Sequence, residues 1–316
     1  MQWPLNNEPC DCYFESWISL EGNAVKIKNQ IVNQRMDKQQ YKGRHQELPA
    51  VYTNAKWNNL VTYRGLAPFT NDTLTHIKKL LQNYAWVDWP ATENWAANVD
   101  SSNWGLGIWN EGTQEFKGGF AGNWGDRGGE KDFPTAYIAP IQQEILDYNI
   151  THNYQFTMIL GSVNEIRNYV YSHRNKKQLP SYKFINNRQS WIYENAIDAG
   201  WPIKNKLSIH LSKGAAMISP QLLWNAADAS YVTFSATYNS KVEKTRIFWR
   251  PFGGYFEDKN SVVFTIIPDG QLHQYKIPLS VATNYKGALT GLKILLDADN
   301  NADGNNVVDV YAISLQ

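Results

Sequence analysis

The chain has 316 residues, 43% of them hydrophobic, which suffices for one large domain or two medium-sized domains with buried cores. Its 30 Lys and Arg residues nearly balance 29 Asp and Glu residues, a formal net charge of +1, so charge gives no reason to expect nucleic acid or an anionic membrane as a partner. No apolar run approaches the roughly 20 residues that cross a bilayer, and the first residues lack the basic and apolar segments of a signal peptide. We therefore expect a globular protein, and neither a membrane span nor an export signal is visible in this chain.

Aromatic residues are the unusual part of the composition. The chain holds 13 Trp, 18 Tyr and 12 Phe, 14% of its residues, beside 19% charged residues. Flat rings pack on the apolar faces of pyranoses and neutral amides hydrogen-bond to hydroxyl groups, so this composition points toward glycans. The alternative is that Trp and Tyr fill and border the cores of β-sandwiches.

Alternation of apolar and polar side chains predicts strands through most of the first 160 residues. A hairpin is expected over residues 18–32, with its turn at Glu21-Gly22-Asn23. Further strands are expected at residues 50–53, 59–63, 95–99, 105–109 and 153–160. Two short helices are expected: residues 71–82, and residues 163–172, where Ser162 and Glu165 match a capping box.

Residues 173–183 form a basic run with a proline and few apolar side chains, which predicts a connection between domains with the boundary near residue 180. Strands are expected again at residues 207–211, 231–238, 245–250, 261–267, 273–278, 291–296 and 307–315. Short strands at that spacing are typical of a sandwich or jelly roll. The predicted fold is all-β, with two antiparallel β-sandwich domains at residues 1–180 and 181–316 and a few short helices.

Four stretches of the second half carry a family resemblance, namely residues 198–201 (DAGW), 247–250 (IFWR), 268–275 (PDGQLHQY) and 285–293 (YKGALTGLK). Through them, residues 185–316 resemble the jelly-roll carbohydrate-binding modules attached to secreted bacterial polysaccharide-degrading enzymes. The resemblance implies a glycan as partner and a secreted, periplasmic or cell-surface location. Its motifs are structural rather than catalytic.

In the first half, the hairpin of residues 20–32, the Leu48 to Tyr52 stretch, and residues 94–97 with 104–107 are similar to the supersandwich domains related to galactose mutarotase. That resemblance implies either a sugar-processing enzyme or an accessory part of a glycosidase or lyase. The first residues already correspond to the interior of the expected sandwich domain. We therefore expect that the N-terminus is incomplete or that it begins on an edge strand.

Catalysis on a glycosidic bond needs two carboxylates that face one another. Glu47, in the Arg44-His45-Gln46-Glu47 stretch, and Glu93, which follows the Trp86 to Pro90 run, are the candidate pair. Asp88 and Glu111 are possible substitutes, and His45 is a candidate proton carrier. The alternative for each carboxylate is a solvated or arginine-paired side chain at the end of a strand.

Binding of a glycan needs exposed rings and polar side chains on one surface. The candidate substrate-binding residues are Arg44, Trp86, Trp89, Trp95, Trp104, Trp109, Trp124 and Arg127. The last two belong to a glycine-rich loop, residues 118–129, which is interpreted either as a flap over a site or as a surface loop with one packed Trp. The loop lacks the lysine and the strand-to-helix setting of a phosphate loop, so no nucleotide or other organic cofactor is expected.

The stretch from Asp299 contains Asp-x-Asn-x-Asp-Gly, the first half of a calcium-binding loop. It predicts a structural Ca²⁺ held by Asp299, Asn301, Asp303 and Asp309, although Asp309 falls one place short of the usual closing carboxylate. A plain acidic turn is the alternative. Cys10 and Cys12 make a poor metal site without further Cys or His ligands, and are interpreted as core residues.

Carbohydrate recognition by a binding or accessory protein of bacterial glycan breakdown is the favoured function, because the aromatic signal is stronger than any carboxylate motif. A glycoside hydrolase or related glycan-active enzyme that uses carboxylates of the first domain is the first alternative. The second is a scaffold for a catalytic region absent from this chain. The identity of the sugar, its linkage and the oligomeric state do not follow from the sequence.

Overall fold

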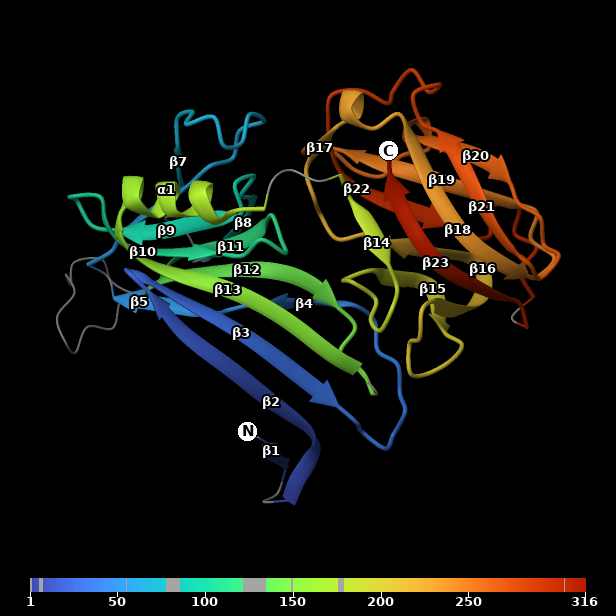
Figure 1. Ribbon diagram of the computed structural model, residues 1–316, viewed down its shortest axis with the longest axis horizontal. Helices are drawn as coiled ribbons and strands as arrows, with labels where there is room; N and C mark the ends of the chain where they lie inside the picture. Colours follow the sequence, from blue (N-terminus) through green and yellow to red (C-terminus); the bar gives the residue numbers. More distant parts are fainter. Residues whose placement is uncertain are drawn as a thin grey trace.

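The alternating segments of the chain form three antiparallel β-sheets, and Figure 1 shows them as two sandwiches side by side in a computed structural model. The structure describes residues 2–5, 8–54, 56–77, 86–121, 135–148, 150–175, 179–303 and 305–316. The fold is all-β, as predicted, and α1 (Val163–His173) is the one α-helix in these segments. None of the described helices has the length and apolar character needed to cross a membrane.

The first sandwich begins with an eight-stranded sheet, in which most of the strands predicted for residues 1–162 lie. Its spatial order is β1 (Gln2–Leu5), β2 (Glu8–Glu21), β3 (Ala24–Asn33), β13 (Ile150–Ser162), β10 (Trp104–Trp109), β9 (Trp95–Val99), β6 (Asn59–Thr62) and β7 (Thr75–Ile77). The predicted hairpin is the pair β2 and β3, and Gly22 in its turn has a φ of 59°, which glycine adopts without steric cost.

A five-stranded sheet completes the first sandwich. It contains β4 (Arg44–Glu47), β12 (Thr135–Glu144), β11 (Glu115–Ala121) and β8 (Trp86–Pro90) in that order, and β5 (Val51–Asn54) also pairs with β12. The sequence did not predict β8, β11 and β12, because Pro90, Pro140 and the pair Gly118-Gly119 interrupt their apolar pattern. Part of the glycine-rich segment expected to be a loop, residues 118–121, is therefore strand, and residues 122–129 lie outside the described part of the chain.

Both faces of the eight-stranded sheet are covered at its centre. Leu60, Ala96 and Ile108 pack against the five-stranded sheet, while Trp95 and Ala97 pack against α1 on the opposite face. Figure 1 shows α1 lying over β9 and β10. For that reason every residue of β9 is buried, whereas a sheet with one solvated face would show alternation. The helix itself begins as predicted, with the reciprocal capping box between Ser162 and Glu165.

The helix predicted for residues 71–82 does not form in the described residues. Residues 75–77 are instead the strand β7, in which Ile77 lies opposite Leu60 of β6. Two side chains fix the non-helical conformation at Asp72, just before β7. Arg167 donates to the Asp72 carbonyl oxygen at 2.7 Å, and Tyr63 donates to the Asp72 carboxylate at 3.1 Å. A helix would need that carbonyl oxygen for its own backbone hydrogen bond. Residues 78–82 lie outside the described part of the chain.

The second sandwich is one sheet that wraps around its own core. Its central order is β20 (Ser261–Thr265), β19 (Lys244–Pro251), β22 (Ala288–Leu295), β16 (Leu207–Ile218), β23 (Val307–Leu315), β18 (Tyr231–Asn239) and β21 (Leu272–Pro278), with β14 (Ser181–Lys183), β15 (Ile192–Asp198) and β17 (Trp224–Asn225) paired at its margins. Strand β16 pairs with β23 before Gly214 and with β22 after it. Gly214 has a φ of 71°, so the chain bends there and the sheet folds over. Trp191, Trp249 and Tyr238 fill the enclosed core.

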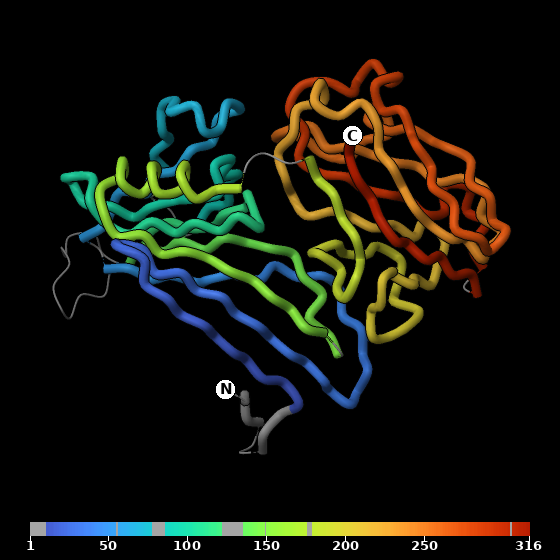
Figure 2. Tube along the Cα trace, in the orientation of Figure 1, coloured from blue at the N-terminus to red at the C-terminus, as the bar shows by residue number. Residues whose placement is uncertain are grey.

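A buried arginine joins the two sandwiches. Arg188 lies between Asp147, which follows β12, and Asp198 at the end of β15, and it also donates to the Ile145 carbonyl oxygen at 3.3 Å. The segment of residues 34–43, between β3 and β4, runs along the second sandwich, as Figure 2 shows. There Gln40 accepts a hydrogen bond from the backbone N–H of Asp198 at 2.7 Å. The junction therefore combines ionic and neutral hydrogen bonds.

Two further titratable groups are buried at the junction. Glu144 of β12 accepts a hydrogen bond from Ser190 of the second sandwich, and its Oε2 lies 3.8 Å from Nδ1 of His152 on β13. Burial raises the pKa of Glu144 to about 7 and lowers the pKa of His152 to about 4. Between these pH values both side chains are largely neutral, so their contact is not an ion pair.

Replacing either member of this pair should change the pH dependence of stability, in opposite directions. The stability that protonated Glu144 contributes is present near pH 4.5 and is lost as the pH rises to 7, whereas the contribution of neutral His152 is present at pH 6.5 and is lost as the pH falls to 4. On acidification the free energy of unfolding, measured with urea, should fall more steeply in Glu144→Gln than in the wild type. It should fall less steeply in His152→Gln. Parallel profiles for the three proteins would contradict this account.

Candidate functional site

One face of the five-stranded sheet, called the outer face below, points away from the eight-stranded sheet. The opposite face carries Trp89, Phe116 and Ile138 into the core of the first sandwich. Residues directly opposite one another on paired strands share a face, which places Tyr52, Tyr137, Gly119 and Trp86 in one row across the outer face. The pairing register, which the sequence alone does not give, therefore aligns aromatic residues from three strands.

The three rings of this row pack on one another. Tyr137 lies 4.7 Å, centroid to centroid, from both Tyr52 and Trp86, and those two rings are 6.5 Å apart. Gly119 sits opposite both Tyr137 and Trp86, and its missing side chain leaves room for their contact. Tyr137 is 1% exposed, whereas Tyr52 is 62% exposed. We call these rings the aromatic row; Tyr52 presents it most fully to solvent, and Tyr137 supports it from below.

Charged groups lie next to the aromatic row on the same face. Lys117 pairs with Asp88 at 3.1 Å on the neighbouring strand. Burial raises the pKa of the Tyr137 hydroxyl, and the nearby Glu47 carboxylate raises it further, although the two do not have hydrogen-bond geometry. Donors and acceptors therefore border the rings, which is the arrangement that a polyhydroxylated ligand requires.

A small cavity of about 240 Å³ adjoins this face where it meets the second sandwich. His45, Asp88 and Glu115 of the sheet line it together with Arg250 of β19. Burial raises the pKa of the Glu115 carboxyl, Arg250 and His45 oppose that shift, and Asp88 adds to it. His45 itself makes a 2.8 Å contact with Gln143. The cavity thus places a half-buried carboxyl on the outer face, separated from the aromatic row by Lys117 and Asp88.

The structure brings together only part of the predicted sugar-binding set. Trp86 is in the aromatic row, but Trp89 and Trp95 are 3% and 0% exposed and pack in the core, so neither can present a ring to a ligand. Trp109 is buried against Tyr169 of α1. Trp104 is exposed, yet it lies on the other sheet of the sandwich, against Trp57. Core packing thus accounts for three of the tryptophans.

The remaining predicted sugar-binding residues fall elsewhere. Arg44 lies on the face opposite to that of His45, beside Glu144 on the neighbouring strand. Trp124 and Arg127 lie outside the described residues. Glu111, a substitute carboxylate in the sequence analysis, accepts hydrogen bonds from the backbone N–H and the side chain of Asn175.

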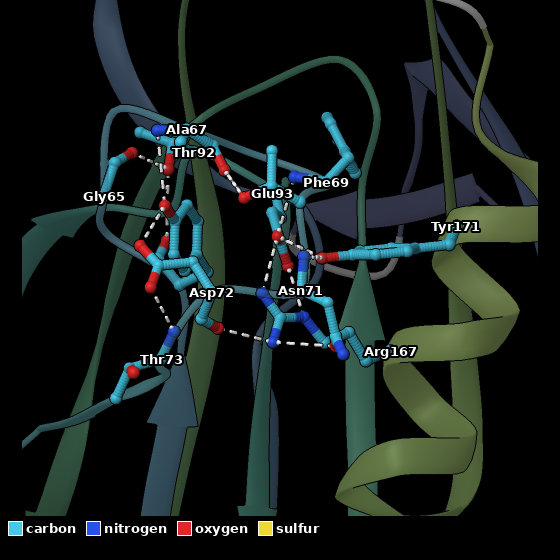
Figure 3. A network of polar contacts seen from close by, with 12 residues as sticks. Gly65, Ala67, Phe69, Asn71, Asp72, Thr73, Thr92, Glu93, Arg167 and Tyr171 are labelled. Atoms are coloured by element: carbon cyan, nitrogen blue, oxygen red, sulfur yellow. Dashed lines mark hydrogen bonds and ion pairs between the residues drawn. The ribbon is translucent and has the colours of Figure 1, made fainter.

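Glu93 is buried beneath α1, whereas Glu47 is exposed on β4, and Figure 3 shows the contacts that hold the Glu93 carboxylate. Its carboxylate accepts hydrogen bonds from Arg167 at 2.9 and 3.1 Å, from the Tyr171 hydroxyl at 2.6 Å and from the backbone N–H of Phe69 at 2.8 Å. The Trp95 indole N–H adds a contact of 3.0 Å. With 0% of its surface exposed and both oxygens occupied, Glu93 is a structural residue here, and Glu47 and Glu93 do not form the facing pair that the sequence predicted.

The predicted calcium ligands are also separated. Asp309 lies on β23, where it pairs with Lys206 at 2.6 Å and accepts from Ser208, and Asp303 accepts hydrogen bonds from Asn306 and from the backbone N–H of Asn305. Among the described residues, no group of three acidic, His or Cys side chains is close enough together to hold a metal ion. Asp297, which the motif did not include, is 1% exposed, and its Oδ2 and the Oδ1 of Asp299 have no hydrogen-bond partner among the described residues.

Several residues of the outer face were missed by sequence reasoning. Tyr137 and Glu115 lie on strands that the sequence did not predict, and Arg250 approaches from the other sandwich. The alternation of Tyr137, Ala139 and Ile141 was an available signal, but Pro140 in the middle of that segment obscured it.

Comparison with known proteins adds similarity of fold. No protein-family model and no curated protein sequence matches the chain. Among solved structures, it is similar to a low-affinity xylan-binding module from Roseburia intestinalis (13% identity, TM-score 0.29, 44% of this chain and 96% of that one) and to a family 11 carbohydrate-binding module of a Clostridium thermocellum cellulase (12%, 0.28, 45% and 89%). A Paenibacillus xanthan lyase is similar over the whole chain (8% identity, TM-score 0.35, 41% of the lyase). At such low scores these similarities carry no conclusion about function.

Truncating the two predicted catalytic carboxylates should affect stability very differently. Glu93→Ala leaves the buried Arg167 without its counter-charge, so the free energy of unfolding should fall by about 3–5 kcal/mol. Glu47→Ala, the matched control at an exposed position, should change it by less than about 0.5 kcal/mol. Chemical denaturation of the three proteins measures both values, and equal effects of the two substitutions would refute the assignment of Glu93 to the fold.

Proposed function

We propose that the protein binds carbohydrate, and that the aromatic row on the outer face is its contact surface. The observation that carries the proposal is the packing of Tyr52 and Trp86 on a buried Tyr137, which fixes ring surface beside a strip of polar groups. Rings held in place by a neighbour lose little conformational freedom on binding, and their apolar faces match those of a pyranose. A role in glycan breakdown outside the cell, as an accessory protein, is part of the same proposal.

The polar groups beside the row supply the hydrogen bonds that a sugar needs. Lys117 donates and Asp88 accepts, and the two are already paired, so their approach to a neutral ligand leaves no isolated charge. The cavity of about 240 Å³ next to the row has room for a terminal sugar unit or a branch. We therefore infer that the ligand is a chain that lies across the rings and ends or branches toward Arg250.

Hydrolysis of the bound glycan is a second candidate function, favoured by the placement of two carboxylates on the outer face. Glu47 and Glu115 both lie opposite Ile141 of β12, from its two neighbouring strands, so their Cα atoms are about 10 Å apart. Burial raises the pKa of Glu115, as a general acid requires, and Glu47 is exposed. Inverting glycosidases hold their carboxyl groups at about 6.5–9.5 Å, within reach of this spacing.

Binding should depend on the aromatic row. In affinity electrophoresis or calorimetry with whichever polysaccharide of a panel binds the wild type, Tyr52→Ala and Trp86→Ala should each weaken binding about tenfold or more, because an anchoring ring is lost. Tyr52→Phe keeps the ring and should bind within about threefold of the wild type. Tyr255→Ala, which removes an 80% exposed ring from the second sandwich, is the matched control. If only the control loses binding, the contact surface is not the aromatic row.

The same proteins separate binding from hydrolysis. Release of reducing ends from a bound polysaccharide, abolished in Glu115→Gln while binding persists, would establish a hydrolase. Binding without any product would leave the protein as a binding module.

We also propose that the turn of residues 297–303 binds calcium, through Asp297 and Asp299 rather than through the full predicted set. Burial raises the pKa of Asp297, and the neighbouring Asp299 raises it further, so two carboxylates with unpartnered oxygens face one another. A divalent cation between them would remove that repulsion. Asp309 is committed to Lys206 and is not part of this proposal.

Calcium should therefore raise the melting temperature of the wild type by several degrees relative to a sample in chelator, because a ligand that binds only the folded state stabilises it. Asp299→Asn should lose that increase, and Asp309→Asn should keep it. Identical melting temperatures with calcium and with chelator would overturn the calcium proposal.

A further inference from the structure

A second cavity lies between the two sandwiches, away from the outer face. Its volume is about 620 Å³, within the range of about 300–1,000 Å³ that is usual for sites of small ligands. Its walls are the first half of β13, the end of β12, the turn at residues 110–112 and the loop of residues 187–190 in the second sandwich. The junction around Arg188 thus forms the cavity as it joins the sandwiches.

One wall of this cavity is an open strand edge. Strand β13 pairs with β3 from residue 150 onward, but its pairing with β10 begins only at Thr157. Within the described pairing, residues 150–156 therefore have a strand on one side only. Every second backbone N–H and C=O of that segment points toward the open side, and such groups need hydrogen-bond partners.

Neutral amides are the most frequent side chains around this edge. Eight of the 19 lining residues are Asn or Gln, and Ile150 is the one aliphatic residue among the described lining. The amides come from several elements, for example Gln155 on β13, Gln142 on β12 and Gln189 in the second sandwich. Gln142 and Gln189 each donate one hydrogen bond to a backbone carbonyl oxygen and keep a second donor and the acceptor. An amide offers two donors and an acceptor, which suits hydroxyl groups that both give and take hydrogen bonds.

Aromatic surface and unused polar atoms complete the lining. The rings of His152, Tyr154 and Phe156 stack along one face of β13, with centroids 5.8 and 6.4 Å apart. His152 is 8% exposed, and its Nε2 has no hydrogen-bond partner among the described residues. The Tyr154 hydroxyl and the Gln155 amide likewise make no hydrogen bond within the described part of the chain. Tyr154 and Gln155, whose side chains point to opposite faces of β13, both line the cavity with unspent hydrogen-bonding capacity, whereas Nε2 of His152 is buried.

Part of the charge near the cavity is neutralised by the protein itself. Arg188 is held between Asp147 and Asp198, and Glu144 and His152 are largely neutral in mildly acidic solution. Glu111, which accepts hydrogen bonds from Asn175, and the exposed Lys28 are lining residues without an ion-pair partner among the described residues. The neutral amides therefore outnumber the charges open to a ligand, which favours an uncharged ligand.

We propose that this cavity is a second binding site, which takes a short, uncharged oligosaccharide with its hydroxyls on the amides and on the open edge of β13. It goes beyond the binding of a glycan chain proposed for the outer face, because it shares no residue with the aromatic row. A β-strand peptide could also pair with an open edge, but such ligands need pockets for apolar or charged side chains, and the lining offers amides instead.

The test uses the full chain with neutral tetrasaccharides (cellotetraose, xylotetraose and mannotetraose), measured by calorimetry and by ligand-observed NMR. At least one should bind, and Tyr154→Phe and Gln155→Ala should each weaken that binding about fivefold or more, through loss of a hydrogen-bonding group. Gln274→Ala on β21, outside both proposed sites, is the matched control and should leave it within twofold. Tyr154→Phe keeps the ring stack, so folding is preserved.

Hydrogen exchange supplies an independent readout. The bound tetrasaccharide should slow amide exchange in residues 150–156 and not in β5 or β8. The proposal is overturned if no tetrasaccharide binds, if binding survives both cavity substitutions, or if an extended peptide rather than a sugar protects residues 150–156. If Trp86→Ala loses tetrasaccharide binding while the two cavity variants keep it, the tetrasaccharide binds to the outer face and not to the cavity. If the wild type binds the tetrasaccharide but no polysaccharide, the outer-face proposal is refuted and the cavity proposal stands.

Discussion

The buried guanidinium of Arg188 is the constraint on which the arrangement of the two sandwiches depends. A charge with so little exposed surface must be compensated within the protein, and its carboxylates, Asp147 and Asp198, come from opposite sides of the junction. The indole of Trp201 stacks on the same group, with its centroid 4.4 Å away. Because these partners fix where the second sandwich sits, they also decide that Arg250 reaches the edge of the outer face and that a cavity remains beside β13.

Packing then divides the aromatic residues by role. Trp95, Trp191 and Trp249 are fully buried and hold the cores, so much of the high aromatic content serves the fold. Tyr52 and Trp86 escape the core because they point to the other side of a two-layered sandwich, and Tyr137 keeps them in place. The same alternation that buries one residue of a strand exposes the next, which is how β8 supplies both Trp89 to the core and Trp86 to the surface.

Paired or neutral polar groups occur on both surfaces proposed to bind sugars. Lys117 pairs with Asp88 on the outer face, and burial keeps Glu144 and His152 largely uncharged in mildly acidic solution between the sandwiches. This agrees with a chain whose net charge is close to zero. The stronger electrostatic interactions, Glu93 with Arg167 and Arg188 with its two aspartates, are withdrawn from solvent and hold loops and domains rather than ligands.

The sequence by itself determined the all-β class, the seven central strands of the second sandwich, the first hairpin and the capped helix α1, because alternation and capping are local patterns. It did not predict β8, β11 and β12, because their glycines and prolines are typical of loops. These segments are strands because neighbouring strands supply hydrogen-bond partners for their backbone groups. Only the tertiary structure decided that Glu93 is an arginine partner and that Tyr137 supports Trp86. Pairing register and burial depend on contacts between residues far apart in the chain, and the type of a residue does not determine which of those residues it contacts.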